Sequence, residues 1–205
     1  MAAGDDRGHR GQRRQKGRTL RLTEPRQMLA LAHPLRLHLL GALRAMGPAT
    51  ATILAERVEA SVPLVSYHLR QLAANGFIEQ AESPTGDGRE RWWRASHQRT
   101  SWSRVDFLDT PERRAAEQAL SLEVVRRYAE AAERWLERSD GWPREWVEAA
   151  DMSDWIVNVT PSELRAMRSE IGAVIERYAS QPKGEGRALV HAIVNLLPRG
   201  EVPTR

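Results

Sequence analysis

The sequence contains no cysteine. Disulfide bonds, thiolate metal sites, iron–sulfur clusters and cysteine nucleophiles are therefore all excluded. The sequence also lacks any apolar run that approaches the length of a membrane-spanning helix, and its N-terminus is too charged for the apolar region of a signal peptide. We therefore expect a soluble, cytoplasmic protein with no membrane partner.

Signatures of catalysis and of cofactor binding are also missing. No glycine-rich phosphate loop is present, and the serines and histidines show no spacing typical of a nucleophile and its base. The six histidines have no ligand-like spacing with carboxylates. We therefore expect no enzymatic activity, no bound cofactor and no metal.

The formal charge of +4 is unevenly distributed along the 205 residues. Residues 1–18 carry a net charge of +4, residues 19–100 carry +3 and residues 101–205 carry −3. Residues 1–18 hold almost nothing that a core could bury, so we expect a disordered basic arm. This arm either follows DNA phosphates or is a plain solvated tail. A basic region followed by an acidic one indicates a polyanion-binding module joined to a second module, although an ordinary solvated surface gives the same imbalance.

Residues 61–75 are predicted to form an amphipathic helix that can recognise DNA. Apolar residues recur at helical spacing on one side, at Val65, Leu69 and Leu72. The opposite side carries hydrogen-bonding groups that can reach base edges or phosphates, at Ser66, Tyr67 and Arg70. Ser61 is a plausible N-cap, Pro63 fits the first turn, and Gly76 supplies a left-handed stop. The alternative is an ordinary amphipathic surface helix.

The flanking segments favour the DNA-binding interpretation. Helices are predicted over about 24–32, over 34–46 and from Thr50 or Thr52 to about Glu59, so the 61–75 helix would be the second helix of a helix-turn-helix. A strand over 77–82, turn residues over 83–88 and a returning strand over 89–94 predict a β-hairpin. A helix-turn-helix followed by a β-hairpin is the winged-helix arrangement.

Four segments together resemble a known family. They are Ala-His-Pro-Leu-Arg at 32–36, Val-Ser-Tyr-His-Leu at 65–69, Asn-Gly-Phe-Ile at 75–78 and Gly-Arg-Glu-Arg-Trp-Trp at 88–93. Over roughly residues 24–95 the chain resembles the ArsR-like winged-helix transcriptional regulators. The resemblance implies a homodimer that binds double-stranded DNA at a promoter. Metal-sensing members carry a cysteine motif before the recognition helix, where this chain has Ile-Leu-Ala-Glu-Arg, so metal sensing through that site is excluded.

The candidate DNA-contacting residues lie on the recognition helix and the wing. They are Ser61, Pro63, Ser66, Tyr67 and Arg70 on the helix, and Arg89 and Arg91 on the wing. An arginine that is bidentate to guanine contributes about 1–3 kcal/mol of discrimination. We expect His68 to pack against its own domain, and one of Trp92 and Trp93 to anchor the hairpin, because neighbouring strand residues point to opposite faces.

A long helix is predicted over 111–138, after Thr110-Pro111-Glu112. Two neighbouring apolar stripes run along it, the first through Leu120, Val124, Tyr128, Ala131 and Trp135, the second through Leu122, Val125, Ala129, Ala132 and Leu136. An apolar face this broad exceeds the seam of a two-stranded coiled coil. We expect a dimerisation helix that uses Leu120, Val124, Tyr128 and Trp135. The alternative is burial wholly within the monomer.

The remaining C-terminal residues are predicted to form a small α+β unit. A strand over 155–159, a helix after Thr160-Pro161-Ser162-Glu163 and a last strand over 187–197 follow from the pattern. This order is similar to the C-terminal extension of actinobacterial-type winged-helix regulators. We expect Trp142, Trp146 and Trp155 to fill its core rather than line a ligand pocket.

These patterns predict an α+β fold that is mainly α. Its parts are the basic arm (1–18), a winged helix-turn-helix domain (19–100), and a dimerisation helix followed by a small α+β unit that we expect to be regulatory (101–205). We expect a homodimeric transcriptional regulator on an inverted-repeat operator, acting as a repressor, although activation is equally compatible. Two alternatives remain open: a small-molecule effector bound in the C-terminal unit, and a winged helix used as a protein-interaction module.

Overall fold

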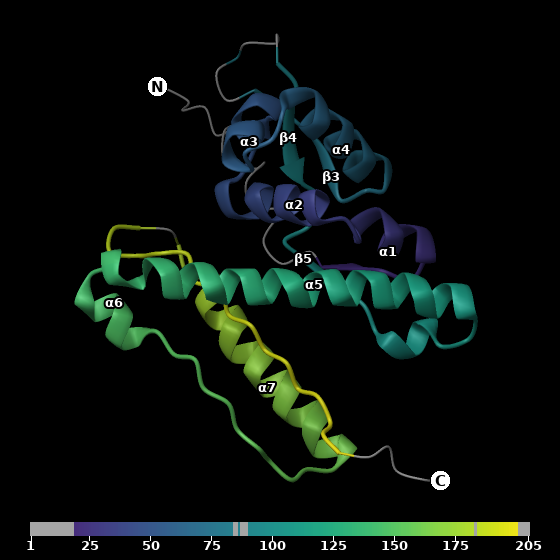
Figure 1. Ribbon diagram of the computed structural model, residues 1–205, viewed down its shortest axis with the longest axis vertical. Coiled ribbons are helices and arrows are strands. Elements are labelled where there is room, and N and C mark those ends of the chain that lie inside the picture. The colour runs from purple at the N-terminus through teal and green to yellow at the C-terminus, as the bar shows by residue number, and fades with distance from the viewer. Residues whose placement is uncertain (1–18, 84–85, 87–89, 183, 201–205) are drawn as a thin grey trace, which may run out of the picture. The chain divides into compact units, whose positions relative to one another are not determined.

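A computed structural model describes residues 19–83, 86, 90–182 and 184–200 (Figure 1). The chain divides into two compact units, residues 1–129 and 130–205. The boundary between these two units lies inside a long helix. The expected basic arm, residues 1–18, lies outside the described residues.

The first unit contains the four predicted helices. They are α1 (Pro25–Leu31), α2 (Pro34–Met46), α3 (Ala51–Arg57) and α4 (Val62–Ala74). The break before α2 occurs at His33, which has an extended backbone as expected of a residue before proline. Thr50 caps α3 by accepting a hydrogen bond from the Ile53 N–H at 3.3 Å. Gly76 follows α4 with a φ of 75°, which confirms the predicted left-handed stop.

The wing is a three-stranded antiparallel sheet. The predicted hairpin is confirmed as β3 (Ile78–Ala81) and β4 (Trp92–Ala95), with Gln80 opposite Trp93. A third strand that was not predicted, β2 (Ala49–Thr50), pairs with the other edge of β4. A second, two-stranded parallel sheet, also not predicted, joins β1 (Thr19–Arg21) to β5 (Arg99–Ser101).

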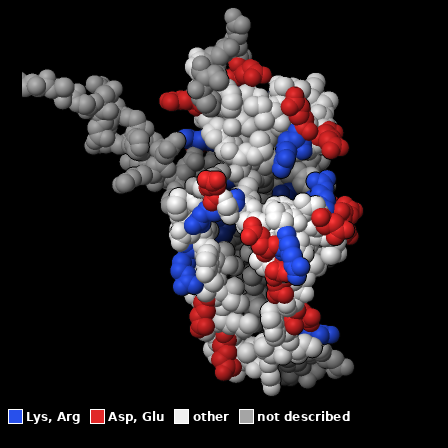
Figure 2. Space-filling model, turned by 90° about the vertical axis from the view of Figure 1, so that its left-hand side faces the viewer, with Lys and Arg blue, Asp and Glu red and all other residues white. Residues whose placement is uncertain are grey.

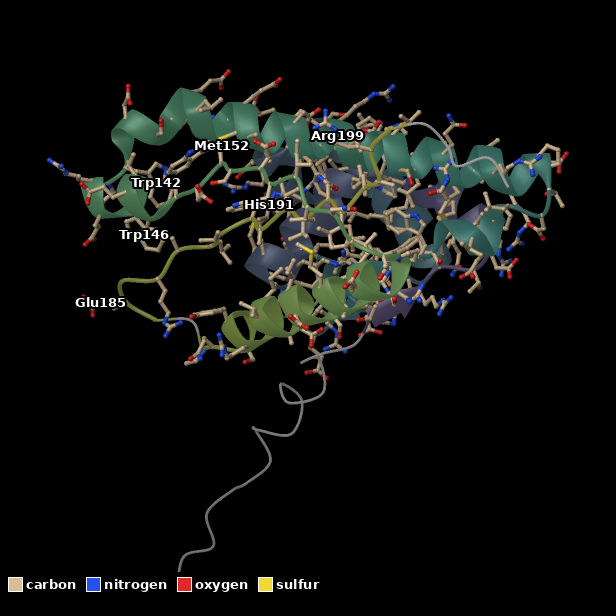
Figure 3. The ribbon with its side chains drawn as sticks, turned by 90° about the horizontal axis from the view of Figure 1, so that it is seen from below. Trp142, Trp146, Met152, Glu185, His191 and Arg199 are labelled. Carbon is tan, nitrogen blue, oxygen red and sulfur yellow. The ribbon has the colours of Figure 1, made fainter. Side chains whose placement is uncertain are left out.

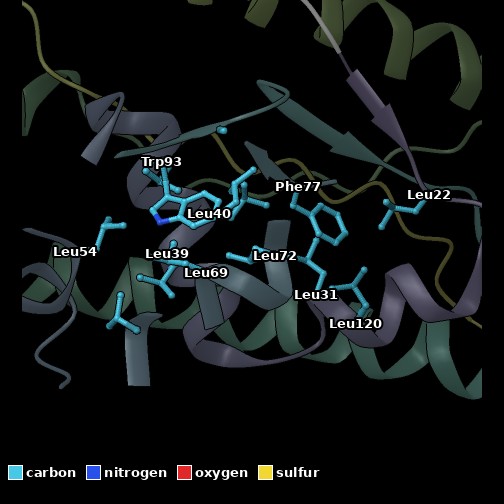
Figure 4. Packing of buried hydrophobic residues seen from close by; sticks show 14 of the residues in the cluster. Leu22, Leu31, Leu39, Leu40, Leu54, Leu69, Leu72, Phe77, Trp93 and Leu120 are labelled. Carbon is cyan, nitrogen blue, oxygen red and sulfur yellow. The ribbon is translucent and has the colours of Figure 1, made fainter. Parts of the chain in front are cut away.

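One hydrophobic cluster holds the first unit together (Figure 4). The core faces of α2 and α4 meet Phe77 and the wing residue Trp93 in this cluster. Trp93 is 8% exposed, whereas Trp92 is half-buried, so Trp93 is the tryptophan that anchors the hairpin. Phe107, from a short 3-10 helix (Arg104–Phe107), completes the core with two residues of the long helix that follows.

The long helix α5 (Pro111–Arg138) has the predicted bounds. Ala116 and Leu120 are buried in the core of the first unit. Leu120 of the first apolar stripe leaves no surface for a partner because its side chain is 0% exposed, and Val124 packs partly against the same core. Apolar residues of the second stripe remain exposed, with Leu122 at 48% and Val125 at 58%.

The second unit consists of the end of α5, a 3-10 turn (Ser139–Gly141), α6 (Arg144–Ala149) and α7 (Pro161–Ala179). The predicted capping box at the start of α7 is confirmed: the Glu163 N–H donates to Thr160 Oγ1, and the Glu163 carboxylate accepts from the Thr160 N–H at 2.7 Å. The Thr160 N–H and the Thr160 hydroxyl both donate to the Glu163 carboxylate, and these two hydrogen bonds lower the pKa of Glu163.

The two strands predicted in this unit are wrong. Residues 155–159 and 187–197 are irregular, and no strand occurs among the described residues after 130. A strand needs a neighbouring strand to pair with its backbone N–H and C=O groups, and neither segment lies in a sheet with another described segment of its unit. The small α+β unit expected at the C-terminus is therefore helical with irregular connections.

The expectation for the three tryptophans is also wrong in part. Trp155 is 77% exposed and belongs to no core. Trp142 and Trp146 lie close together around the start of α6 (Figure 3). Their ring centroids are 5.9 Å apart, and the Trp142 centroid lies 6.1 Å from that of Trp135. Trp142 nevertheless remains 40% exposed, so this aromatic contact forms at a surface.

Candidate nucleic-acid interface

The recognition helix α4 is anchored through one face and open on the other. Val65, Leu69 and Leu72 are each 0% exposed in the core, as predicted. Tyr67 and Arg70 lie on the outward face and are exposed, with Tyr67 at 51%. The amphipathic pattern therefore holds a polar face toward the outside on a rigid helix.

A groove of about 390 Å³ lies between this helix, the start of α3 and the wing. Its lining consists of Thr50, Ala51, Thr52, Val62, Ser66, Arg70, Glu90, Arg91 and Trp93. The fold thus brings together Ser66 and Arg70 from the recognition helix with Arg91 from the wing, 21 positions after Arg70 in the printed sequence. Nothing in the local sequence of either element predicts this meeting.

The two groove arginines are each oriented by a neighbour. Arg70 Nε donates to the Ser66 carbonyl oxygen at 3.1 Å, one helical turn earlier. The Arg91 guanidinium lies 5.6 Å from the Trp93 ring centroid, within the range of a cation–π contact. Both side chains are exposed, so their charge is available to an anionic ligand.

One carboxylate opposes them. Glu90 lines the same groove and accepts a hydrogen bond from Thr52 Oγ1 at 3.1 Å. A carboxylate at this position repels a phosphate and attracts a hydrogen-bond donor such as a base amino group. Figure 2 shows one face of the molecule, on which acidic and basic side chains are interspersed and do not form a patch of one sign.

A histidine pair underlies the recognition helix. His68 is 4% exposed, which confirms that it packs against its own domain, and its ring centroid lies 4.4 Å from that of His33. His33 Nδ1 accepts a hydrogen bond from the Leu35 N–H at 3.2 Å, which caps α2. His68 Nδ1 is buried with no hydrogen-bond partner among the described residues. The sequence marked both histidines only as parts of a motif and did not predict their contact.

Both histidines favour the neutral form. Burial lowers the pKa of His68 most, and His33 and Arg36 lower it further. Burial also lowers the pKa of His33, with Arg36 acting in the same direction and Glu123 of α5 opposing it. A neutral pair is what the cap requires, because a protonated His33 Nδ1 could no longer accept the Leu35 N–H.

Not all of the predicted contact residues line the groove, since the exposed Tyr67 of α4 does not. Ser61 and Pro63 are exposed at the start of α4 and do not line it, and Ser61 forms no side-chain capping hydrogen bond. Arg89 lies outside the described residues. Sequence reasoning missed the groove residues Thr52 and Glu90; Thr52 was considered only as a cap.

Of the residues assigned to dimerisation, Val124, Tyr128 and Trp135 are half-buried, while Leu120 is fully buried. Only the exposed parts of Val124, Tyr128 and Trp135 are therefore available for contact with a second copy. The exposed apolar surface of α5 in the first unit comes instead from Leu122 and Val125.

The donor set of the chain does not fit a metal-sensing site. Cysteine is absent from the sequence, and within the described ranges no group of three or more histidine or carboxylate side chains is placed to hold a metal ion. Separately, none of the helices in the part of the chain that the structure describes is long and apolar enough to cross a membrane.

One family profile matches a part of the first unit. A protein-family profile described as a helix-turn-helix domain matches residues 31–81, which span α2, α3, α4 and β3. Among solved structures, a mutant of Lactococcus lactis ZitR in apo form is similar at 14% identity, over 71% of this chain and 81% of that chain, with a TM-score of 0.29. No curated protein matches the chain. Residues 31–81, which contain α2, α3 and α4, therefore form a helix-turn-helix domain.

Proposed function

We propose that the chain is a DNA-binding transcriptional regulator whose groove between α4 and the wing contacts duplex DNA. The observation that carries the proposal is the meeting of Ser66, Arg70 and Arg91 around one groove on the outward face of a helix-turn-helix. Arg70 suits a guanine edge in the major groove, and Arg91 suits a phosphate or the minor groove beside it. This is a binding function, and we propose no catalytic one.

We further propose that the active form is a homodimer on an inverted repeat. The support is the exposed apolar pair Leu122 and Val125 on α5, which a soluble helix does not normally leave uncovered at adjacent turns. A two-fold dimer would place two recognition helices about one DNA turn apart. Occlusion of a promoter by such a dimer represses transcription, and repression is the sign of regulation we propose.

The test is selection of genomic fragments with the purified protein, followed by affinity measurements over a salt series. We expect an inverted repeat to be enriched, with affinity that falls steeply with salt because arginines displace counterions from phosphate. The variant Arg70→Ala should bind the selected site about tenfold or more weakly, in line with the loss of one bidentate base contact. Its affinity for unrelated DNA should change much less.

The matched control is Arg168→Ala, which removes the same charge from an exposed position on α7. This variant should bind the selected site as the wild type does. Equal losses in the two variants would reduce the role of Arg70 to bulk charge. Failure to enrich any sequence at any salt concentration would overturn base recognition and favour a protein-interaction role for the winged helix.

A further inference from the structure

The second unit leaves its apolar side chains uncovered. None of the described residues from 130 to 200 is buried. The two irregular segments 155–159 and 188–197 are the clearest case, with nine large apolar side chains at least 36% exposed: Trp155, Ile156, Val157, Val159, Leu189, Val190, Ile193, Val194 and Leu197. Soluble monomers rarely expose so many large apolar residues within two short segments.

Apart from His191, the described residues of these segments also form no backbone–backbone hydrogen bonds. No backbone–backbone hydrogen bond joins a residue of 154–159 or of 188–197 to another described residue, His191 being left aside. Both segments are rich in β-branched residues, which favour strands. They therefore combine the composition of strands with backbone donors and acceptors that have no strand to pair with.

The exposed apolar area matches what a dimer interface needs. Covering nine such side chains removes on the order of 500 Å² or more of apolar surface per chain. A standard interface buries about 800 Å² per partner, of which about 65% is apolar in homodimers. These two segments alone can thus supply the apolar part of one side of a homodimer interface.

The absence of charge indicates what covers the segments. Residues 155–159 and 188–197 contain no aspartate, glutamate, lysine or arginine. They offer nothing to a partner that is recognised by charge, and they can face their own copy without repulsion, as a two-fold interface requires. Once α5 pairs with a second copy, covalent linkage also raises the effective concentration of these segments.

We propose that residues 155–159 and 188–197 form β-strands by pairing with the same segments of a second copy, which builds a shared sheet at the C-terminal end of the dimer. The inference rests on the homodimer of the proposed function and names a second surface for it. Pairing between copies explains why a sequence with strand-like alternation shows no strand in a single chain. A lone pair of strands is marginal in water, and two chains together supply four.

Hydrogen exchange on the full chain, at protein concentrations above and below the dimer dissociation constant, tests this pairing. Amides of 155–159 and 188–197 should exchange about tenfold or more slowly in the dimer and lose that protection on dilution. Protection that does not depend on concentration would mean pairing within one chain and would overturn the proposal. Unprotected segments in a chain that is demonstrably dimeric would overturn it as well.

A substitution provides the second test. Val190→Glu places a charge in the apolar surface and should raise the dimer dissociation constant at least tenfold in sedimentation experiments. The control Gln181→Glu adds the same charge at an exposed position outside both segments and should leave the constant unchanged. Helix content measured by circular dichroism should be the same in both variants.

The outcomes separate this inference from the proposed function. If Val190→Glu dimerises and binds the selected DNA as the wild type does, the proposed shared sheet is wrong, and the proposed DNA-binding function is unaffected. If the wild-type dimer shows concentration-dependent protection but selects no DNA sequence, the proposed DNA-binding function is wrong, and the proposed shared sheet is supported.

Discussion

At the scale of single residues, one face of α4 packs in the core and the opposite face carries the proposed DNA-contacting residues. Leu69 has no exposed surface and packs in the core, whereas Leu64 on the same helix is 45% exposed. Arg70 follows Leu69 directly and yet points outward, because successive helical residues are separated by about 100° around the axis. Burial of one neighbour therefore orients the other.

Replacing Leu69 by Ala should lower the free energy of unfolding by about 2–5 kcal/mol, because the substitution leaves a cavity in a packed core. Urea denaturation followed by circular dichroism measures this value. The control Leu64→Ala makes the same chemical change at an exposed position and should cost much less. Equal costs at the two positions would contradict the placement of the core face.

At the scale of elements, the histidine pair couples the start of α2 to the recognition helix. His33 caps α2, and its ring contacts the ring of His68 of α4 in a tilted arrangement. The His68 ring centroid also lies 5.1 Å from that of Tyr67. The charged groups that influence the pair are Arg36 of α2 and Glu123 of α5. Protonating either ring places a new positive charge beside the other ring and beside Arg36.

This arrangement predicts an acid-sensitive helix junction. The pKa values of His33 and His68 are lowered in the folded chain, so between those values and the ordinary 6.5 the unfolded chain binds more protons. Stability should therefore be full above pH 6.5 and fall as the pH drops below it. The midpoint of urea unfolding, measured from pH 8 to pH 5, checks this expectation.

The variant His68→Gln should lose part of this pH dependence, because it removes one of the two titrating rings. The control His9→Gln removes a histidine of the predicted basic arm and should retain all of it. A wild-type midpoint that does not change between pH 7 and pH 5.5 would show that the pair does not couple protonation to folding.

At the scale of the whole molecule, the uncovered apolar residues are the feature that remains to be explained. The first unit buries its core residues in one cluster, whereas α5 and the second unit keep large apolar side chains exposed. In the proposed homodimer a second copy of the chain would cover both sets, with α5 as one surface and the C-terminal segments as another. The operator affinity of such a regulator then depends on protein concentration.

The variant Val125→Glu should shift the protein toward the monomer and weaken binding to the inverted repeat at least tenfold, because a charge replaces apolar contact area. Gln118→Glu adds the same charge at an exposed polar position of α5 and serves as the control. Sedimentation velocity and binding to a single half-site distinguish the effects. Unchanged dimerisation in Val125→Glu would remove this face of α5 from the interface.

The sequence by itself determined the four helices of the first unit, the helix-turn-helix, the hairpin, the bounds of α5 and the start of α7, but not α6. These features depend on caps, proline positions and apolar spacing within about ten residues of each other. The core face of α4 and its outward Tyr67 and Arg70 follow from the same local pattern. Most of the N-terminal fold and half of the candidate interface could therefore be predicted.

Only the tertiary structure decided the relations between distant segments. These relations are the pairing of β2 with β4, the contact between the His33 and His68 rings, and the position of Glu90 in the same groove as Arg70. Such contacts depend on packing between distant segments, which no local pattern encodes. The tertiary structure also decided which stripe of α5 is buried. A strand-like alternation over 155–159 did not form a strand, since a strand exists only where another strand satisfies its backbone hydrogen bonds.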